Sequence, residues 1–114
     1  MVVDQELTDE EVDRLFRALA DATRRDIVRR TLGEGASISD LASRYDMSFA
    51  AVQKHVAVLE EVGLVTKQPR GRERIVRGNP APIEQAQALL DQYEAIWRDR
   101  IERLDALLAE PDDQ

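Results

Sequence analysis

The sequence predicts a mainly α-helical domain of about five helices that also carries one β-hairpin. Two observations predict it. Apolar residues recur at helical spacing in several segments, and the stretch 64–77 instead has strand composition on both sides of a Pro/Gly turn signal. Four of the helical segments begin with residues that cap helices well: Thr8, Asp21, Ser37 and Ser48.

The length and composition suit one domain with a single core, because the chain has 114 residues of which 43% are hydrophobic. We expect this domain to span 1–110 and a disordered tail to follow at 111–114. No apolar run predicts a membrane span, and no basic segment followed by an apolar stretch predicts an export signal. The chain has no cysteine, which excludes disulfides and thiolate metal sites, and a cytoplasmic location is expected.

The charge of the chain is unevenly distributed. The net charge of −7 argues at first against a nucleic-acid partner, but residues 44–79 carry seven basic and four acidic side chains. The acidic excess lies in residues 1–20 and 80–114. A basic middle between acidic ends is consistent with a DNA-binding surface whose nonspecific binding to phosphates is limited, although ordinary scatter of surface charge is the alternative.

The first helix is expected to begin after Thr8. Thr8 and Glu11 form the capping-box pattern, and Leu7 with Val12 form a hydrophobic staple. Four apolar residues then mark one face of this helix: Val12, Leu15, Phe16 and Leu19.

Three further helices follow in quick succession. The second is expected over 21–32, and a short third over 37–45. The tight turn 46–48 leads directly into a fourth helix over 49–62. Two helices joined by such a turn form a helix-turn-helix.

The segment 47–63 gives the strongest indication of function. Ser48 is a good N-cap and Gly63 a good helix stop, and a single apolar stripe runs between them: Val52, Val56 and Leu59. The opposite face is small and polar: Ala50, Gln53, Lys54 and Ala57. Such a face is poor for a core but suits a helix that enters the major groove of DNA. We therefore interpret this helix as a recognition helix, and the protein as a transcription regulator.

A β-hairpin is expected directly after the helix-turn-helix. Residues 64–68 and 73–77 have strand composition, and 69–72 is the turn between them. Between residues 67 and 77 the hairpin carries four arginines and one lysine. A basic hairpin in this position is a wing, so the predicted fold is a winged helix-turn-helix.

A long last helix is expected from residue 83 to about 109, preceded by the capping pair Asn79 and Pro80. Its apolar positions recur at spacings of three and four over the whole length, which is more apolar surface than one small domain covers. We predict a homodimer through the first and last helices; packing against the chain's own core is the alternative. The predicted interface residues are Leu15, Phe16, Leu19, Leu90, Tyr93, Trp97, Ile101, Leu104 and Leu108.

Taken together, these segments resemble the ArsR-type winged-helix repressors. Residues 18–27, ALADATRRDI, resemble that family's "ALADPTRRxIL" signature, with Ala22 in place of the usual proline. Residues 48–65 resemble its recognition segment, and the match extends over about 12–108. The resemblance implies a homodimer that represses by occupying an operator, with the first and last helices usually forming the dimer interface.

Metal sensing by the family's usual routes is not expected. Sensors of that kind carry cysteines where this chain has Ser37 to Ser39, or histidines and carboxylates on the last helix. This chain has no cysteine and no histidine after His55, whereas a divalent transition metal needs three or four such ligands. We predict no metal and no cofactor, and an inducer of unknown identity stays possible.

The predicted DNA contacts divide into two groups. Gln53 is expected to pair with adenine and Lys54 with guanine, while Ala50 allows close approach and Ser48 with the helix N-terminus holds a phosphate. Arginines of the hairpin are expected on the DNA backbone: Arg70, Arg72 and Arg74.

Two residues at the flanks of the recognition helix are ambiguous. Phe49 could contact a thymine methyl group or pack beside Met47. His55, the only histidine, is expected to be half buried and to bond a phosphate or a neighbouring carbonyl.

Three classes of function compete. A dimeric DNA-binding repressor would need an imperfect palindrome with half-sites about 34–36 Å apart. An enzyme is not expected, because the sequence has no phosphate-binding glycine loop, no nucleophile paired with a base and no metal triad. A winged-helix protein-interaction module that no longer binds DNA is the alternative that the acidic net charge favours.

Overall fold

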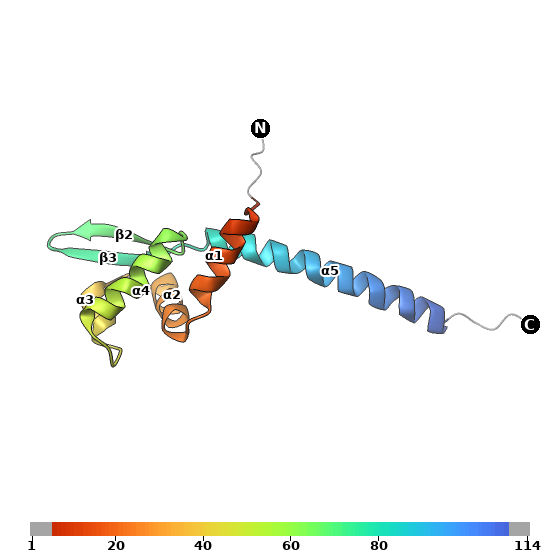
Figure 1. Cartoon of the computed structure of the whole chain (residues 1–114), viewed down its shortest axis with the longest axis horizontal. Coiled ribbons are helices and arrows are strands. Elements are labelled where there is room, and N and C mark those ends of the chain that lie inside the picture. The colour runs from red at the N-terminus through yellow and green to blue at the C-terminus, as the bar shows by residue number, and fades with distance from the viewer. Residues whose placement is uncertain (1–5, 110–114) are drawn as a thin grey trace, which may run out of the picture.

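A computed structural model describes residues 6–109, and in this range the elements follow the predicted order (Figure 1). The helices are α1 (Asp9–Leu19), α2 (Ala22–Gly33), α3 (Ile38–Ala42), α4 (Phe49–Glu61) and α5 (Ala81–Ala109). The strands are β1 (Ala36–Ser37), β2 (Val65–Arg70) and β3 (Glu73–Gly78). The mainly α fold with a β-hairpin is confirmed, and the tail predicted at 111–114 lies outside the described residues.

The helices begin where local capping predicts. Thr8 and Glu11 form a complete capping box, because the Thr8 hydroxyl accepts from the Glu11 amide at 3.1 Å and the Glu11 carboxylate accepts from the Thr8 amide at 2.9 Å. Three other residues likewise accept from the amide three positions on: Asp21, Ser37 and Ser48. Four helix starts are therefore fixed by their own sequence.

The sheet has one strand more than the sequence analysis predicted. β1 has only two residues and pairs antiparallel with β3, so the strand order is β1-β3-β2. A two-residue strand has no readable periodicity, which is why the pattern did not reveal it. β2 also extends through Pro69 and Arg70, which the sequence predicts in the turn. Because β2 is an edge strand, the missing N–H of Pro69 need not break the ladder.

The hairpin turn is correspondingly tight. Arg70 pairs with Glu73, so only Gly71 and Arg72 connect the strands. Gly71 has φ of +64°, a left-handed conformation that glycine adopts without strain.

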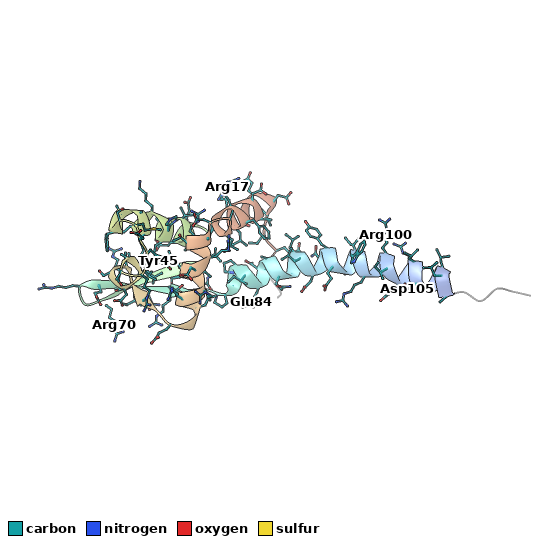
Figure 2. All side chains as sticks on the ribbon, turned by 90° about the horizontal axis from the view of Figure 1, so that it is seen from below. Arg17, Tyr45, Arg70, Glu84, Arg100 and Asp105 are labelled. Carbon is teal, nitrogen blue, oxygen red and sulfur yellow. The ribbon has the colours of Figure 1, made fainter. Side chains whose placement is uncertain are left out.

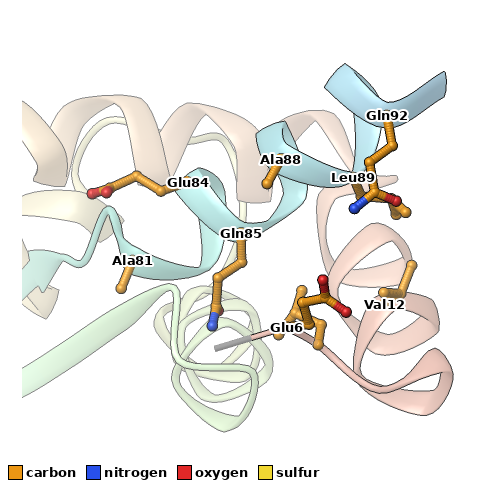
Figure 3. Close-up of a pocket in the computed structure, with 9 residues that line it drawn as sticks. Glu6, Val12, Ala81, Glu84, Gln85, Ala88, Leu89 and Gln92 are labelled. Carbon is orange, nitrogen blue, oxygen red and sulfur yellow. The ribbon is translucent and has the colours of Figure 1, made fainter. Parts of the chain in front are cut away.

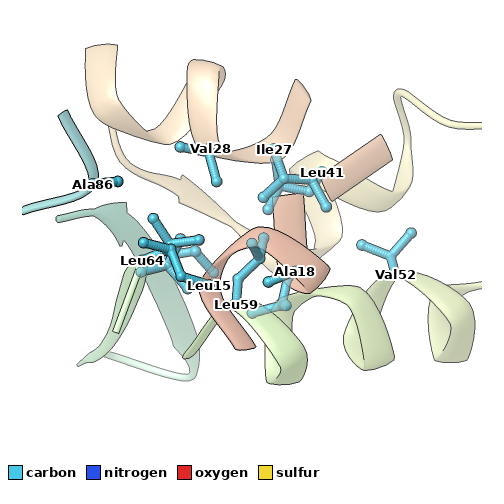
Figure 4. Close-up of a cluster of buried hydrophobic side chains, with 12 residues drawn as sticks. Leu15, Ala18, Ile27, Val28, Leu41, Val52, Leu59, Leu64 and Ala86 are labelled. Carbon is cyan, nitrogen blue, oxygen red and sulfur yellow. The ribbon is translucent and has the colours of Figure 1, made fainter. Parts of the chain in front are cut away.

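One core holds the helices and the base of the wing together (Figure 4). The predicted stripe of α4 is fully buried in it, and α1, α2, α3 and β3 contribute from the other sides. Leu15 also belongs to this core and is only 2% exposed. The prediction that Leu15 lies in a dimer interface is therefore wrong, because its side chain packs inside its own protomer.

Asn79 connects three elements at the base of the wing. Its backbone amide donates to the Leu64 carbonyl at 2.8 Å, and its side-chain amide donates to the Gly63 carbonyl at 3.0 Å. Its side-chain oxygen accepts from the Ala81 amide at 3.2 Å. α5 begins at Ala81, one residue later than the predicted pair of Asn79 as N-cap and Pro80 as first helical residue requires, but the Asn79 side chain still bonds the first amide of the helix and fixes the end of α4 against the start of α5.

Beyond this start, α5 leaves the body of the protein. Figure 1 shows it extending away from the side opposite to the wing. Only Pro82 and Ala86 of α5 are buried. The structure therefore leaves most of the predicted apolar stripe uncovered by the protomer itself.

Candidate nucleic-acid interface

The helix-turn-helix presents α4 with its polar face outward. Val52, Val56 and Leu59 are fully buried, so the opposite side of α4 must face solvent. All four residues of the predicted outer face are exposed: Ala50, Gln53, Lys54 and Ala57. Two small side chains beside one amide and one ammonium leave room for a DNA groove edge to approach the helix.

The wing and the first turns of α4 meet around a shared hollow. A cavity of about 200 Å³ is lined by residues of both elements, among them Phe49, Gln53, Arg72 and Arg74. Phe49 is 46% exposed there. Four of the predicted DNA contacts, which lie about twenty residues apart in sequence, are thus brought to one place by the fold.

The three wing arginines are available for an external anion. Arg70, Arg72 and Arg74 are all exposed, and no ion pair within residues 6–109 holds them. Arg70 extends from the end of the hairpin in Figure 2. Arg77, by contrast, donates to the Gln68 side chain at 3.3 Å within the sheet.

An ion pair that the sequence analysis did not predict connects the wing to α4. The Lys67 ammonium lies 3.2 Å from the Glu60 carboxylate at the end of α4. The two residues are seven apart on different elements, and only the fold of the hairpin brings them together. This pair orients the base of β2 against α4.

His55 is turned toward the start of α2. Its Nδ1 lies 3.3 Å from an Arg24 guanidinium nitrogen and 4.0 Å from an Asp21 carboxylate oxygen. Because a guanidinium only donates, this contact needs Nδ1 as its acceptor, and the contact does not involve Nε2. The sequence analysis leaves a phosphate and a neighbouring carbonyl open as partners of His55, and within residues 6–109 its ring meets Arg24 and Asp21 instead of a carbonyl.

Two arginines at the start of α2 fix the end of α1. The Arg24 guanidinium donates to the carbonyls of Ala18 at 2.6 Å and Arg17 at 3.1 Å, and Arg25 donates to the Leu19 carbonyl at 2.8 Å. Cations are favourable at a helix C-terminus, where carbonyls lack partners. Arg24 and Arg25 therefore hold the end of α1 against α2. Arg24 also connects both helices to α4 through His55.

A second polar cluster holds α2 against the segment that follows α3. The Asp26 carboxylate accepts from the Tyr45 hydroxyl at 2.6 Å and from Arg30 at 2.7 Å, and it also accepts from Arg29. The Tyr45 hydrogen bond, followed by that of Arg30, holds the pKa of Asp26 well below its usual range. Burial, followed by the bond to Asp26, raises the pKa of Tyr45 to about 12. This cluster sets the position of the turn before α4.

Replacing Asp26 with asparagine is expected to lower the free energy of unfolding by about 2–3 kcal/mol, because the three hydrogen bonds to its carboxylate lose their charge assistance. Urea denaturation at neutral pH measures this difference. The same change at exposed Asp105 is the matched control and should have little effect.

The pH dependence follows from the lowered pKa of Asp26. Its stabilising contribution is fully present above the ordinary pKa of an unfolded aspartate, about 3.9, and is lost as the pH falls toward the lower folded value. The stability difference between wild type and Asp26→Asn should therefore shrink progressively below about pH 4. A difference that stayed constant across this range would contradict the assignment.

Other kinds of site receive no support within residues 6–109. These residues contain no group of three or more histidine, cysteine or carboxylate side chains placed to hold a metal. No helix formed by them is both long and apolar enough to span a bilayer. Ser37 is buried and caps α3.

Comparisons with known proteins agree with the helix-turn-helix fold. A family model described as a helix-turn-helix domain matches residues 19–68. The chain is 35% identical over 81 residues to an HTH-type transcriptional regulator from Mycobacterium tuberculosis, covering 71% of this chain and 76% of that protein. It is 32% identical over 97 residues to the arsenical resistance operon repressor of Escherichia coli, covering 83% and 80%.

Solved structures of transcriptional regulators have the same fold as this chain. An ArsR-like transcriptional regulator from Rhodococcus sp. RHA1 superimposes with a TM-score of 0.75 at 31% identity, covering 90% of this chain and 96% of that one. These relatives are transcriptional regulators and not enzymes, which confirms the prediction that this chain is not an enzyme.

Proposed function

Because the chain belongs to the ArsR family of winged helix-turn-helix transcriptional regulators, we propose that it is a homodimeric repressor that binds an imperfectly palindromic DNA operator in the cytoplasm. The observation that carries the proposal is the outer face of α4, which is exposed, small and polar, and which adjoins the unpaired arginines of the wing. The E. coli relative is named as a repressor, which supports repression here.

In this proposal α4 lies in the major groove. Gln53 pairs with adenine, Lys54 donates to guanine, and Ala50 with Ala57 allow the helix to approach the base edges. The Ser48 end of α4 and the Nε2 edge of His55 lie against phosphates. Phe49, exposed beside Gln53, contacts a thymine methyl group.

Two copies would pair through the uncovered faces of α1 and α5. Phe16 of α1 is exposed, and Leu19 is half buried. α5 supplies the rest of the proposed interface, with Ile101 half buried and the other residues exposed: Leu90, Tyr93, Trp97, Leu104 and Leu108. A two-fold dimer presents two copies of α4 to two half-sites about 34–36 Å apart.

The inducer is proposed not to be a metal bound through the family's usual cysteine or histidine sites. The chain has no cysteine, and its one histidine is bonded to Arg24. Release from the operator would then depend on another signal.

The proposal is tested by a gel-shift titration with the DNA upstream of the protein's own gene, repeated at several salt concentrations. We expect specific binding that weakens steeply with salt, because arginines replace counterions on the phosphates. A winged-helix interaction module that has lost DNA binding would give no specific complex at any salt concentration, and that result would reject the proposal.

Replacing Arg70, Arg72 and Arg74 with alanine is expected to weaken binding to all DNA sequences alike. Each lost phosphate contact lowers the slope of log affinity against log salt by about 1, and the dimer carries two wings, so the triple variant should lose about 6. The measurement is the salt-dependent titration above. Arg14→Ala, which removes one exposed positive charge from α1, should leave the slope unchanged. A triple variant that lost sequence preference but kept the wild-type slope would show that these arginines read bases instead.

A further inference from the structure

The two acidic parts of the chain meet at a hollow beside the start of α5. A cavity of about 430 Å³ lies between the segment that leads into α1 and the first turns of α5 (Figure 3). Its lining comes entirely from residues 6–12 on one side and 81–92 on the other. None of these residues belongs to the proposed DNA interface, so the proposed function does not account for the hollow.

The hollow has an apolar floor and a polar rim. Leu7, Val12 and Leu89 form the floor and are half buried, and of the three only Leu7 packs against the main core. In Figure 3 the side chain of Glu6 lies between those of Gln85 and Val12. Exposed polar side chains from both sides form the rim: Glu6, Glu84 and Gln92. A mostly apolar concavity with a few polar groups at its edge is the usual form of a small-molecule site.

The charge around the hollow is negative. Residues 6–12 contain four acidic side chains and residues 81–92 contain two, while neither segment contains a lysine or an arginine. Each segment also holds the start of a helix, where the helix dipole contributes about +0.5 charge. The two dipoles together therefore offset about one of these six negative charges. Because a concave surface with charges of one sign attracts ions of the opposite sign, the hollow favours a cation.

We propose that this hollow binds a small organic cation in which an ammonium group is joined to an apolar body. The apolar body lies on the floor, and the ammonium donates a charge-assisted hydrogen bond to the Glu6 carboxylate. A carboxylate accepts at several positions, so Glu6 can take the ammonium in addition to bonds within the protein. A metal ion would leave the apolar floor unused, and the described part of the chain has no group of three side chains placed to hold one.

The proposed dimer leaves this hollow open. The residues of α5 that line it lie about 80–180° around the helix from the direction of Trp97, at about 100° per residue. The apolar stripe proposed for the dimer lies within about 40° of that direction. A second copy that packs on the stripe therefore does not occupy the face of α5 that borders the hollow.

Three probes that share one apolar body test the proposal: phenylbutylamine, phenylbutanol and phenylbutyrate. Each is titrated at millimolar concentrations and physiological salt into the isotope-labelled full-length chain, and the NMR shifts of backbone amides give the location of binding and the Kd. We expect the amine to shift amides of residues 6–12 and 81–92 and to bind about tenfold more tightly than the alcohol. The carboxylate should leave these amides unshifted.

Three variants separate the charge from the apolar floor. Glu6→Gln should weaken binding of the amine about tenfold and leave binding of the alcohol unchanged, because it removes the charge and keeps the shape. The control is Glu102→Gln, which removes the same charge from an exposed position about 20 Å beyond Leu89 along α5 and should change neither Kd. Leu89→Ala should weaken the amine and the alcohol alike, by about fivefold, because part of the floor is lost.

The contrary results are equally clear. If none of the probes shifts the amides of residues 6–12 and 81–92, the hollow is not a ligand site. If the carboxylate binds as well as the amine, or if Glu6→Gln keeps the wild-type affinity for the amine, the ligand is not a cation. The measurements contain no DNA, so the proposed function stands or fails separately.

Discussion

Replacing Trp97 and Leu104 together with aspartate is expected to convert the protein into a monomer and to lower its operator affinity about 10²–10⁴-fold, because the second half-site is then no longer bound as part of one complex. Both side chains are exposed in the protomer, so the core that holds α4 is left intact. Sedimentation analysis measures the oligomeric state, and a gel-shift titration measures the affinity.

The matched control introduces the same charge on the other side of the same helix. Ala95→Asp should leave both the dimer and the operator affinity close to wild type, because Ala95 lies about 160° from Trp97 around α5. A Trp97→Asp, Leu104→Asp variant that stayed dimeric would show that another surface joins the two copies. A monomeric variant with undiminished affinity would show that the dimer is not needed for binding.

The second large effect is expected at the outer face of α4. Gln53→Ala and Lys54→Ala should each reduce discrimination between operator and unrelated DNA by about 1–3 kcal/mol, which is roughly a 5- to 150-fold loss. Both side chains are exposed on a helix whose opposite face is buried, so their removal should cost little stability. Titration of operator binding against unrelated competitor DNA measures the change.

The salt dependence separates a base contact from a phosphate contact. Gln53→Ala should keep the wild-type salt slope, because the side chain carries no charge. The control is Gln87→Ala, which removes an amide side chain of the same kind from an exposed position on α5, away from the proposed DNA interface. It should change neither the discrimination between operator and unrelated DNA nor the salt slope. If Gln53→Ala and Lys54→Ala both kept full discrimination, α4 could not be the element that reads the sequence.

Local signals predicted most of the fold. Capping residues such as Thr8 and Ser48 act within three positions of themselves, so their effect is visible in the sequence. The apolar stripe of α4 and the turn at Gly71 are equally local. For the same reason the sequence alone identifies the residues of the candidate interface.

Contacts between distant segments could not be predicted. Asp26 and Tyr45 are 19 residues apart, and Arg24 bonds His55 across 31 residues. On α1, Leu15 and Phe16 are adjacent apolar residues at one edge of the same stripe, and the pattern does not say which one faces inward. The structure buries Leu15 and exposes Phe16, because α2 and α4 pack on the Leu15 side.

The central claim, that the outer face of α4 reads DNA from a symmetric dimer, is tested most directly by a hydroxyl-radical footprint on the bound operator. We predict two protected regions related by a two-fold axis, with centres one helical turn or a multiple of it apart, and loss of both in Gln53→Ala, Lys54→Ala protein at concentrations that saturate the wild type. A single protected region, or an unchanged footprint with the double variant, would contradict the account.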